Sequence, residues 1–325
     1  MPKAIRVYEY GGPEVMKFED LPLAEPGPGQ IRVKQAAIGV NFIDIYFRTG
    51  AYKSPHLPYT PGKEGAGTVS AVGEGVTPFK RGDRVAYGSV PDGCYAEEAV
   101  IPAAAAVPIP DGVDEKTAAA MMLKGLTVEY LLHRTYAVKP GDTILWHAAA
   151  GGVGLIACQW AKHLGATVIG TAGSPEKAEL AKQNGCDHVI LYREEDVAKR
   201  VREITGGKGV PVVYDGVGQA TLMGSLDSLA PLGLLASFGS ASGPIKALDL
   251  GLLAAKGSLY VTRPTLFTYA SRPEILAEMA KNLFSVVQSG AVRIPVNRTY
   301  KLSEAQQVHR DLAGRETTGS TVMVP

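Results

Sequence analysis

The stretch that most constrains the fold is 142–165, which reads as a strand, a glycine turn and a helix in immediate succession. A short apolar run at 143–146 precedes the sequence AAAGGVG at 148–154. Apolar residues then recur with a helical period from Val153 to Leu164, and Gly165 is typical of a helix end. Such a turn lets main-chain N–H groups and the positive end of the helix dipole face an anion. We therefore predict a site for the pyrophosphate of a dinucleotide.

This glycine turn differs from the G-x-G-x-x-G fingerprint at one position. Ala149 stands where the first glycine would be, which leaves Gly151 and Gly154. The alternative is a glycine-rich turn in another kind of α/β protein, because short motifs also occur by chance. The elements that follow the turn favour the dinucleotide site.

Strands and helices alternate after the turn. With 143–146 as the first, we expect six strands, the others at 166–171, 188–191, 210–214, 234–238 and 259–262. Ser174, Pro175 and Glu176 make a clear helix start, and another helix is expected at 194–204. This alternation predicts a doubly wound parallel sheet, whose ligand lies beyond the carboxyl ends of its strands.

The first 110 residues have a different character. Short strands are expected at 5–8, 15–18, 30–40, 65–72, 84–88 and 95–101, separated by glycine and proline turns, which indicates a small β-barrel. Helices are expected at 114–136, where Gly125 suggests a break or close packing, at 271–289, and from Ser303 onward. A strand at 321–324 could return to the barrel. At 325 residues we expect two domains, 1–124 with 266–325, and 125–265.

Composition narrows the class of protein. The formal net charge is +1, so there is no general basic field for nucleic acid. No apolar run is long enough to span a bilayer and the start lacks a signal peptide, so we expect a cytoplasmic protein. Cys94, Cys158 and Cys186 lack the spacing of a disulfide framework or a zinc cluster and are expected to be buried thiols.

The residues after the second strand of the sheet favour NADPH over NADH. An NAD site usually has a carboxylate about 20 residues past the glycine turn, but none occurs here before Glu176, which lies inside the expected helix. Ser174, the helix-start N–H groups and Lys177 instead offer donors and a cation for a phosphate, and Tyr192 could cover the adenine. Alternatively, Lys177 is an ordinary solvated helix charge.

The segment 41–48 combines aromatic and amide side chains without strand alternation. Tyr46 and Tyr52 could offer hydroxyls to a flat aromatic ligand, and Asn41 could hydrogen-bond a ribose or a carbonyl. The alternative is that both tyrosines simply pack against the barrel while half-buried.

Five runs together resemble a known family: Asn41-Phe42-Ile43-Asp44, PGKEGAG at 61–67, KGLT at 124–127, HAAAGGVG at 147–154 and REED at 193–196. The chain resembles the zeta-crystallin-like NADPH:quinone oxidoreductases of the medium-chain dehydrogenase/reductase superfamily over essentially its whole length. The resemblance implies a GroES-like β-barrel domain plus a Rossmann domain with the doubly wound six-stranded parallel sheet. It also implies a homodimer and hydride transfer from NADPH to a quinone.

The resemblance also implies the residues of the cofactor site. The nicotinamide half should meet Asn41, Phe42, Ile43, Asp44, Tyr46 and Thr127, and the ribose and pyrophosphate should meet Tyr130, Gly152 and Val153. The adenosine phosphate end should meet Gly173, Ser174, Lys177 and Tyr192. Flanking residues would be Val217, Phe238, Gly239, Ser240, Ala241, Arg263, Thr265 and Thr317.

The zinc alcohol dehydrogenases of the superfamily provide a contrast. In their pattern a catalytic Cys stands where this chain has Asn41, and a ligand His where it has Lys63; Cys94 is all that remains of a structural Cys lobe. An amide and an ammonium cannot replace a thiolate and an imidazole, so we expect no metal. Asn41, Tyr46 and Tyr52 are the candidate catalytic residues, with the tyrosines as proton donors or stacking rings.

Two other functions remain open. An NADPH-dependent reductase of enone or alkenal double bonds would use the same residues. A dinucleotide-regulated RNA-binding protein would need a local basic stripe such as Lys199, Arg200 and Arg202, which reads more simply as the solvated face of a helix.

Overall fold

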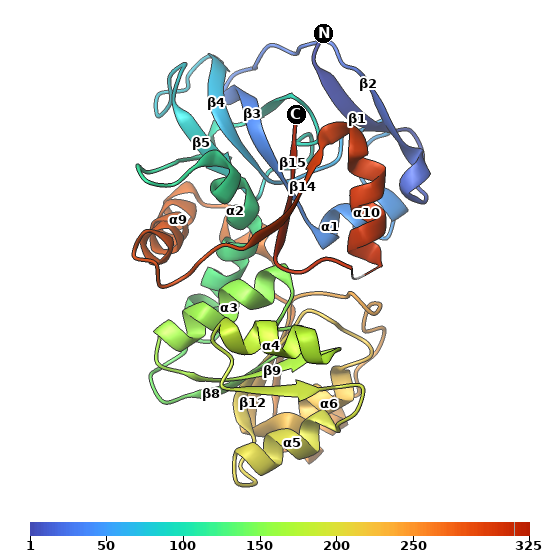
Figure 1. Cartoon of the computed structure of the whole chain (residues 1–325), viewed down its shortest axis with the longest axis vertical. Helices are drawn as coiled ribbons and strands as arrows, with labels where there is room; N and C mark the ends of the chain where they lie inside the picture. The colour runs from blue at the N-terminus through green and yellow to red at the C-terminus, as the bar shows by residue number, and fades with distance from the viewer. Residues whose placement is uncertain (315) are drawn as a thin grey trace. The chain divides into compact units, whose positions relative to one another are not determined.

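The computed structural model describes residues 1–314 and 316–325, which form two compact units. Unit 1 contains Met1–Leu126, Tyr269–Gln288 and Ile294–Pro325, so both ends of the chain, blue and red in Figure 1, belong to it. Unit 2 contains Thr127–Thr268 and Ser289–Arg293. The domain boundaries predicted from the sequence, after residue 124 and before residue 266, remain a prediction.

Unit 1 is built mainly on antiparallel strands, with one parallel pair, β14 and β15. β1 (Lys3–Val7) pairs with β2 (Met16–Asp20), and a seven-stranded sheet has the order β14-β15-β3-β4-β5-β7, with β6 beside β3. The bounds are β3 Gln30–Val40, β4 Gly65–Val72, β5 Arg84–Tyr87, β6 Glu98–Pro102, β7 Val107–Pro108, β14 Val296–Lys301 and β15 Ser320–Val324. β15 pairs antiparallel with β3, so the chain end returns to the barrel as predicted. β14 was not predicted.

The helices of unit 1 include one that the sequence analysis missed. Residues 41–48 were given no helix, but α1 spans Phe42–Thr49. The Asp44 carboxylate accepts a hydrogen bond from the Asn41 N–H (2.9 Å), and Gly50 ends the helix with φ 78°. Besides α2 (Glu115–Glu129), the other helical segments are η1 Pro13–Val15, η2 Ala103–Ala105, α9 Pro273–Gln288, η4 Leu302–Glu304 and α10 Ala305–Ala313.

α2 (Glu115–Glu129) passes Gly125 without a break and continues as a π-helical segment, η3 (Tyr130–Thr135). Of the two expectations for Gly125, close packing is correct. A Cβ at Gly125 would lie 2.5 Å from Leu283 Cδ1 in α9, so a side chain there would force Leu283 to move.

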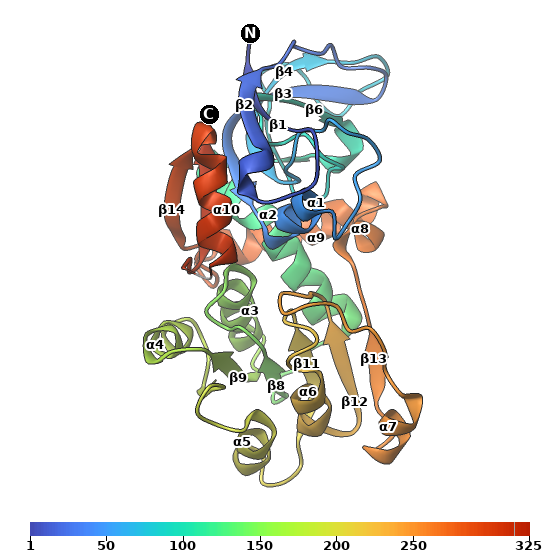
Figure 2. The same cartoon turned by 90° about the vertical axis from the view of Figure 1, so that its right-hand side faces the viewer.

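Unit 2 contains a six-stranded sheet in the order β10-β9-β8-β11-β12-β13, with every neighbouring pair parallel. Figure 2 shows its strands from β9 through β8 and β11 to β13. The bounds are β8 Thr143–Trp146, β9 Thr167–Ala172, β10 His188–Leu191, β11 Val210–Asp215, β12 Leu229–Ser237 and β13 Tyr260–Thr262. The helical segments are α3 Gly152–His163, α4 Pro175–Gln183, α5 Val197–Ile204, α6 Leu222–Ser228, α7 Leu250–Ala255 and α8 Leu266–Tyr269, which extends into unit 1. The predicted doubly wound parallel sheet is confirmed.

Two boundaries in unit 2 were predicted wrongly. α5 begins at Val197, not at residue 194, because Asp196 caps it by accepting from the Lys199 N–H (2.9 Å), while the Glu195 carboxylate accepts from the Leu191 N–H (2.8 Å). β12 begins at Leu229 rather than 234. The strand begins there because Leu229 already pairs with Val210 of β11.

The three cysteines are buried free thiols, as predicted. Cys158 in α3 and Cys186 before β10 lie side by side, with their sulfur atoms 3.3 Å apart. Within the described residues, no helix is both long and apolar enough to cross a membrane.

Candidate functional site

The glycine turn joins β8 to α3 at the carboxyl edge of the sheet. Gly151 is the N-cap of α3, and its N–H donates to the Ala148 carbonyl oxygen (2.9 Å). A Cβ at Gly154 would lie 2.5 Å from that oxygen and 2.6 Å from the Ala149 oxygen, so this glycine lets the helix pack directly on the turn. The first N–H groups of a helix have no partner within it, which leaves those of Gly152 and Val153 suited to a phosphate.

The predicted adenosine end lies at the next strand, β9. Ser174 caps α4 and accepts a hydrogen bond from the Lys177 N–H (3.4 Å). The Tyr192 ring lies on Gly173, since a Cβ there would be 2.6 Å from the Tyr192 hydroxyl. A hydrogen bond from the Ser174 hydroxyl lowers the pKa of the exposed Glu176. The structure therefore brings Gly173, Ser174, Lys177 and Tyr192 together.

Two further turns of unit 2 pack against each other at the same edge. The Ser242 N–H donates to the Val217 carbonyl (2.8 Å), and a Cβ at Gly239 would lie 2.4 Å from the Gly216 oxygen. The Phe238 ring lies 5.5 Å from that of Trp146 at the end of β8. Val217 and residues 238–241 are thus neighbours.

The remaining candidates lie on other elements. Thr127 and Tyr130, at the end of α2 and the start of η3, are buried. Arg263 Nη1 donates to the Pro264 carbonyl (3.0 Å), and the Thr265 carbonyl accepts from the Thr268 N–H (3.2 Å), just after β13. Thr317, in unit 1, is half-buried between α10 and β15.

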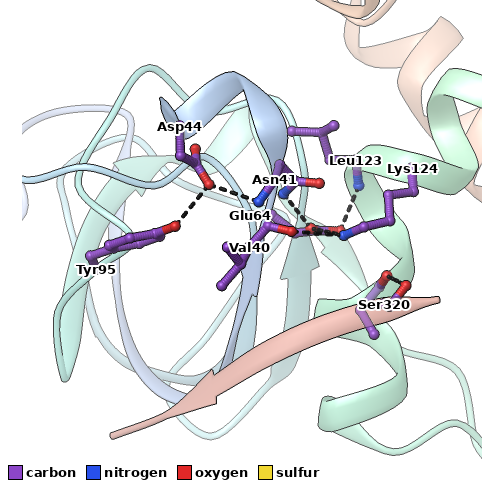
Figure 3. A network of polar contacts seen from close by, with 9 residues as sticks. Val40, Asn41, Asp44, Glu64, Tyr95, Leu123, Lys124 and Ser320 are labelled. Atoms are coloured by element: carbon purple, nitrogen blue, oxygen red, sulfur yellow. Dashed lines mark hydrogen bonds and ion pairs between the residues drawn. The ribbon is translucent and has the colours of Figure 1, made fainter. Parts of the chain in front are cut away.

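The start of α1 in unit 1 carries a buried polar network (Figure 3). Asn41 Nδ2 donates to Glu64 Oε2 (2.7 Å), and the Leu123 N–H donates to Glu64 Oε1 (2.7 Å). Lys124 Nζ lies 3.3 Å from Glu64 Oε2 and 3.2 Å from the Val40 carbonyl. Asn41 was predicted as a site residue, whereas Glu64 and Lys124 were not. Both lie in the runs that carry the family resemblance. A charged residue within such a run was the signal that could have identified them.

A second chain of hydrogen bonds begins at Asp44. Its Oδ2 accepts from the Tyr95 hydroxyl (2.9 Å), which also lies 3.0 Å from His309 Nε2, and His309 Nδ1 lies 3.1 Å from Arg48 Nη1. Burial raises the pKa of Asp44 to about 7, and burial lowers the pKa of His309 to about 3. With neutral His309 accepting from Arg48, its Nε2–H donates to Tyr95, which in turn donates to Asp44.

The aromatic candidates on and after α1 pack on one another. The Phe42 and Tyr46 ring centroids are 5.5 Å apart, and those of Tyr46 and Tyr52 are 5.1 Å apart. Tyr46, Phe42 and Ile43 are half-buried and Tyr52 is exposed. The rings thus pack on one another, Tyr46 while half-buried as the packing alternative expects and Tyr52 while exposed, and their partly exposed faces also suit a flat ligand.

The residues at the expected metal positions do not fit a zinc ion. Lys63 Nζ pairs with Asp92 Oδ1 (2.8 Å) and lies 4.1 Å from the centre of the Phe47 ring. The Asn41 amide nitrogen is a donor, and burial raises the pKa of the Cys94 thiol well above its ordinary value. An ammonium, an amide donor and a protonated thiol offer no zinc ligand set. Among the described residues, no three His, Cys, Asp or Glu side chains form a metal-binding group.

Comparison with known proteins finds relatives that match the whole chain. Residues 27–111 match the alcohol dehydrogenase GroES-like domain, and residues 152–281 match the family described as zinc-binding dehydrogenase. The chain is 56% identical to a quinone oxidoreductase of Pseudomonas aeruginosa, with 100% of both chains covered. It is 46% identical to a 2-haloacrylate reductase of Burkholderia sp., covering 100% of this chain and 99% of that protein. The crystal structure of Escherichia coli quinone oxidoreductase complexed with NADPH gives a TM-score of 0.98 at 48% identity, covering 99% of this chain and 100% of that chain.

Proposed function

Because the chain belongs to the quinone oxidoreductase family of the medium-chain dehydrogenase/reductase superfamily, we propose that it reduces quinones by hydride transfer from NADPH. The observation that carries the cofactor assignment is the adjacency of β8 and β9. This pairing sets the phosphate-binding turn and the start of α4 beside each other at one edge of the sheet.

The side chains of unit 2 would hold the adenosine end of NADPH. The N–H groups of Gly152 and Val153 suit the pyrophosphate, and Ser174 with Lys177 suits the 2′-phosphate. Tyr192 offers a ring beside Gly173 for the adenine side. Thr127, Tyr130, Val217, residues 238–241, Arg263, Thr265 and Thr317 complete the proposed set.

The nicotinamide half is assigned to the start of α1. Bound NADPH supplies the hydride. The buried Glu64 carboxylate fixes the direction of the Asn41 amide, which can then orient a carbonyl of the nicotinamide or of the acceptor. Phe42 and Ile43 offer half-buried apolar contact beside it, while Asp44 holds the turn. Tyr46 and Tyr52 offer hydroxyls that can supply the proton.

The choice of acceptor follows from this chemistry. The Asn41 and Lys63 positions do not fit a metal, so an alkoxide has no Lewis acid there to stabilise it. A quinone or an enone needs less stabilisation because the charge that develops on its oxygen is delocalised. We expect quinones to be the better substrates.

A panel assay tests this function. NADPH oxidation is measured with benzoquinones, naphthoquinones and α,β-unsaturated carbonyl compounds, and kcat/KM is compared. The similarity to a 2-haloacrylate reductase favours the enone or alkenal reductase as the second candidate. Higher kcat/KM for the unsaturated carbonyl compounds would replace the first candidate by the second.

The predicted homodimer also has structural support. β13 is the edge strand of the six-stranded sheet, and Tyr260 and Val261 on it are 61% and 36% exposed. An exposed apolar edge strand is suited to pairing with a second copy of the chain. Light scattering on the purified protein tests this assembly, and a monomeric mass would contradict it.

Two remaining predictions concern the cellular compartment of the protein and its binding of RNA. Three buried free thiols suit the reducing cytoplasm that the sequence predicts. The RNA-binding alternative is weakened because Arg202 donates to the carbonyls of Asp227 and Leu229, and Arg200 pairs with Glu195 (3.0 Å). These arginines already serve the packing of α5.

A further inference from the structure

A buried chain of hydrogen bonds connects two of the turns assigned to the cofactor in unit 2. His147 follows β8 directly, and its ring lies between Thr171 at the end of β9 (Nδ1 to Oγ1, 3.2 Å) and Ser225 in α6 (Nε2 to Oγ, 3.0 Å). The Ser225 hydroxyl donates to Asp215 Oδ2 (2.8 Å), at the end of β11. At the other end, Thr171 Oγ1 accepts from the Ala148 N–H (3.1 Å). His147, Thr171, Ser225 and Asp215 are at most 3% exposed.

Each bond in the chain has one direction. Ser225 has a single hydroxyl proton, which goes to Asp215, so it must accept from His147 Nε2–H. In the neutral imidazole Nδ1 is then an acceptor, and it takes the Thr171 hydroxyl proton. Burial lowers the pKa of His147, which keeps the ring neutral. The order runs from the Ala148 N–H through Thr171 to His147, and from His147 through Ser225 to Asp215.

One end of this chain of hydrogen bonds lies at a strained residue of the glycine turn. Ala148 has φ 55°, in the left-handed region that non-glycine residues rarely adopt. Its N–H is bound by Thr171, and its carbonyl accepts from the Gly151 N–H (2.9 Å). Such a conformation persists only where the surroundings enforce it, and it commonly marks a functional site.

The other end of this chain of hydrogen bonds lies at the turn after β11. Asp215 Oδ1 accepts from the N–H groups of Val217 (2.7 Å) and Gly218 (3.0 Å), and Oδ2 also accepts from the Thr221 hydroxyl (2.7 Å). The carboxylate is therefore fully used in shaping this turn. Removing a link of the chain leaves a buried donor or acceptor unpaired and frees both turns to shift.

We propose that His147, with Thr171 and Ser225, acts as a positioning residue. It holds the glycine turn and the turn at Val217 in fixed positions relative to each other, so that both can contact the dinucleotide. The proposal rests on the proposed NADPH-binding function and adds residues that do not themselves touch the cofactor. Because small misplacements of binding groups cost affinity, loss of the chain should weaken binding of the part common to NADPH and NADH. It should leave the preference for the 2′-phosphate unchanged.

The test compares two buried serines of α6. Ser225→Ala breaks the hydrogen-bond chain, whereas Ser228→Ala removes a hydroxyl that donates to the Gly224 carbonyl within the same helix (2.7 Å). Kd values for NADPH and NADH are measured by cofactor fluorescence on each full-length protein, below its unfolding temperature. We expect Ser225→Ala to raise both Kd values by the same factor, about tenfold, and Ser228→Ala to change neither.

Thr171 supplies a second pair of variants. Thr171→Val removes the hydroxyl at nearly constant shape and should raise both Kd values, while Thr171→Ser retains Oγ and should recover wild-type affinity. In steady state, KM for the nucleotide should rise and KM for the quinone should not, which a mere loss of stability would not produce.

Unchanged Kd values in folded Ser225→Ala and Thr171→Val would overturn the proposal, as would an equal loss in Ser228→Ala. Failure of the wild-type protein to bind either nucleotide would instead refute the proposed function itself.

Discussion

The Tyr95 hydroxyl donates to Asp44 Oδ2 over 2.9 Å, in a site where both side chains are almost completely buried. His309 lies at the other side of the same hydroxyl, at 3.0 Å. The buried network at the start of α1 therefore places an acid and a base on one bridging tyrosine, and burial moves their pKa values in opposite directions.

This pair predicts an unusual dependence of stability on pH. A carboxyl whose pKa is raised to about 7 loses stabilisation as the pH rises from about 4, because only the unfolded state releases the proton. A histidine whose pKa is lowered to about 3 loses stabilisation as the pH falls below about 6.5, because only the unfolded state binds one. Between about pH 4 and 6.5 the contributions of the two groups to the free energy of unfolding change in opposite directions and cancel.

Asp44→Asn removes the acid and leaves the base. We expect the free energy of unfolding of this variant, relative to the wild type, to increase by about 1.4 kcal/mol per pH unit between about pH 4 and 6.5. Urea unfolding at several pH values measures this slope. Parallel pH profiles for the two proteins would show that the groups do not titrate as described.

The buried pair of Glu64 and Lys124 predicts a non-additive effect on stability. Glu64→Gln leaves a buried ammonium without its carboxylate and should cost about 3 kcal/mol, as should Lys124→Met for the converse reason. The double variant should be less destabilised than the sum of the two, since no charge is left unpaired. Additive losses by denaturant unfolding would argue against a coupled pair.

Lys177 should determine the preference for NADPH. Lys177→Ala is expected to weaken NADPH binding about tenfold while leaving NADH nearly unchanged, because a cation beside a phosphate acts only on the cofactor that carries it. Lys182→Ala, in the last turn of the same helix, is the matched control and should change neither. Equal losses of NADPH and NADH in Lys177→Ala, measured by calorimetry, would contradict this role.

Gly154 should tolerate no side chain. Gly154→Ala places a methyl group 2.5 Å from a backbone oxygen of the glycine turn, so the helix must move and dinucleotide binding should be lost. Gly224→Ala is the control, because a Cβ there meets nothing within 4 Å and alanine favours the helix by about 0.5–1 kcal/mol. NADPH retention by a folded Gly154→Ala variant would show that the turn is not the phosphate site.

Local signals were sufficient for most of the fold. The strand, turn and helix from Thr143 to His163 could be predicted because each element carries its own periodicity and boundary residues. α1 was missed although Asn41, Asp44 and Gly50 mark its ends, because its aromatic residues were read as a ligand-binding segment. β14 was missed because its residues are half-buried or exposed, with no apolar face to indicate a strand.

The site could be predicted only at the level of single residues. Asn41 and Glu64 are 23 positions apart, and His147 and Ser225 are 78 apart, so their pairing arises from the tertiary fold. A sequence motif indicates which residue faces a cofactor by likeness, but the side chains that orient it come from other strands. This explains why Asn41 was named and Glu64 and Ser225 were not.

We propose that the protein transfers a hydride from NADPH to a quinone without a metal. The most direct measurement is the rate of NADPH oxidation by a benzoquinone, with enzyme that has been treated with a chelator and dialysed. We predict full turnover that is faster with NADPH than with NADH and does not respond to added zinc. No turnover with any quinone, or activity that returns only when zinc is supplied, would contradict the account.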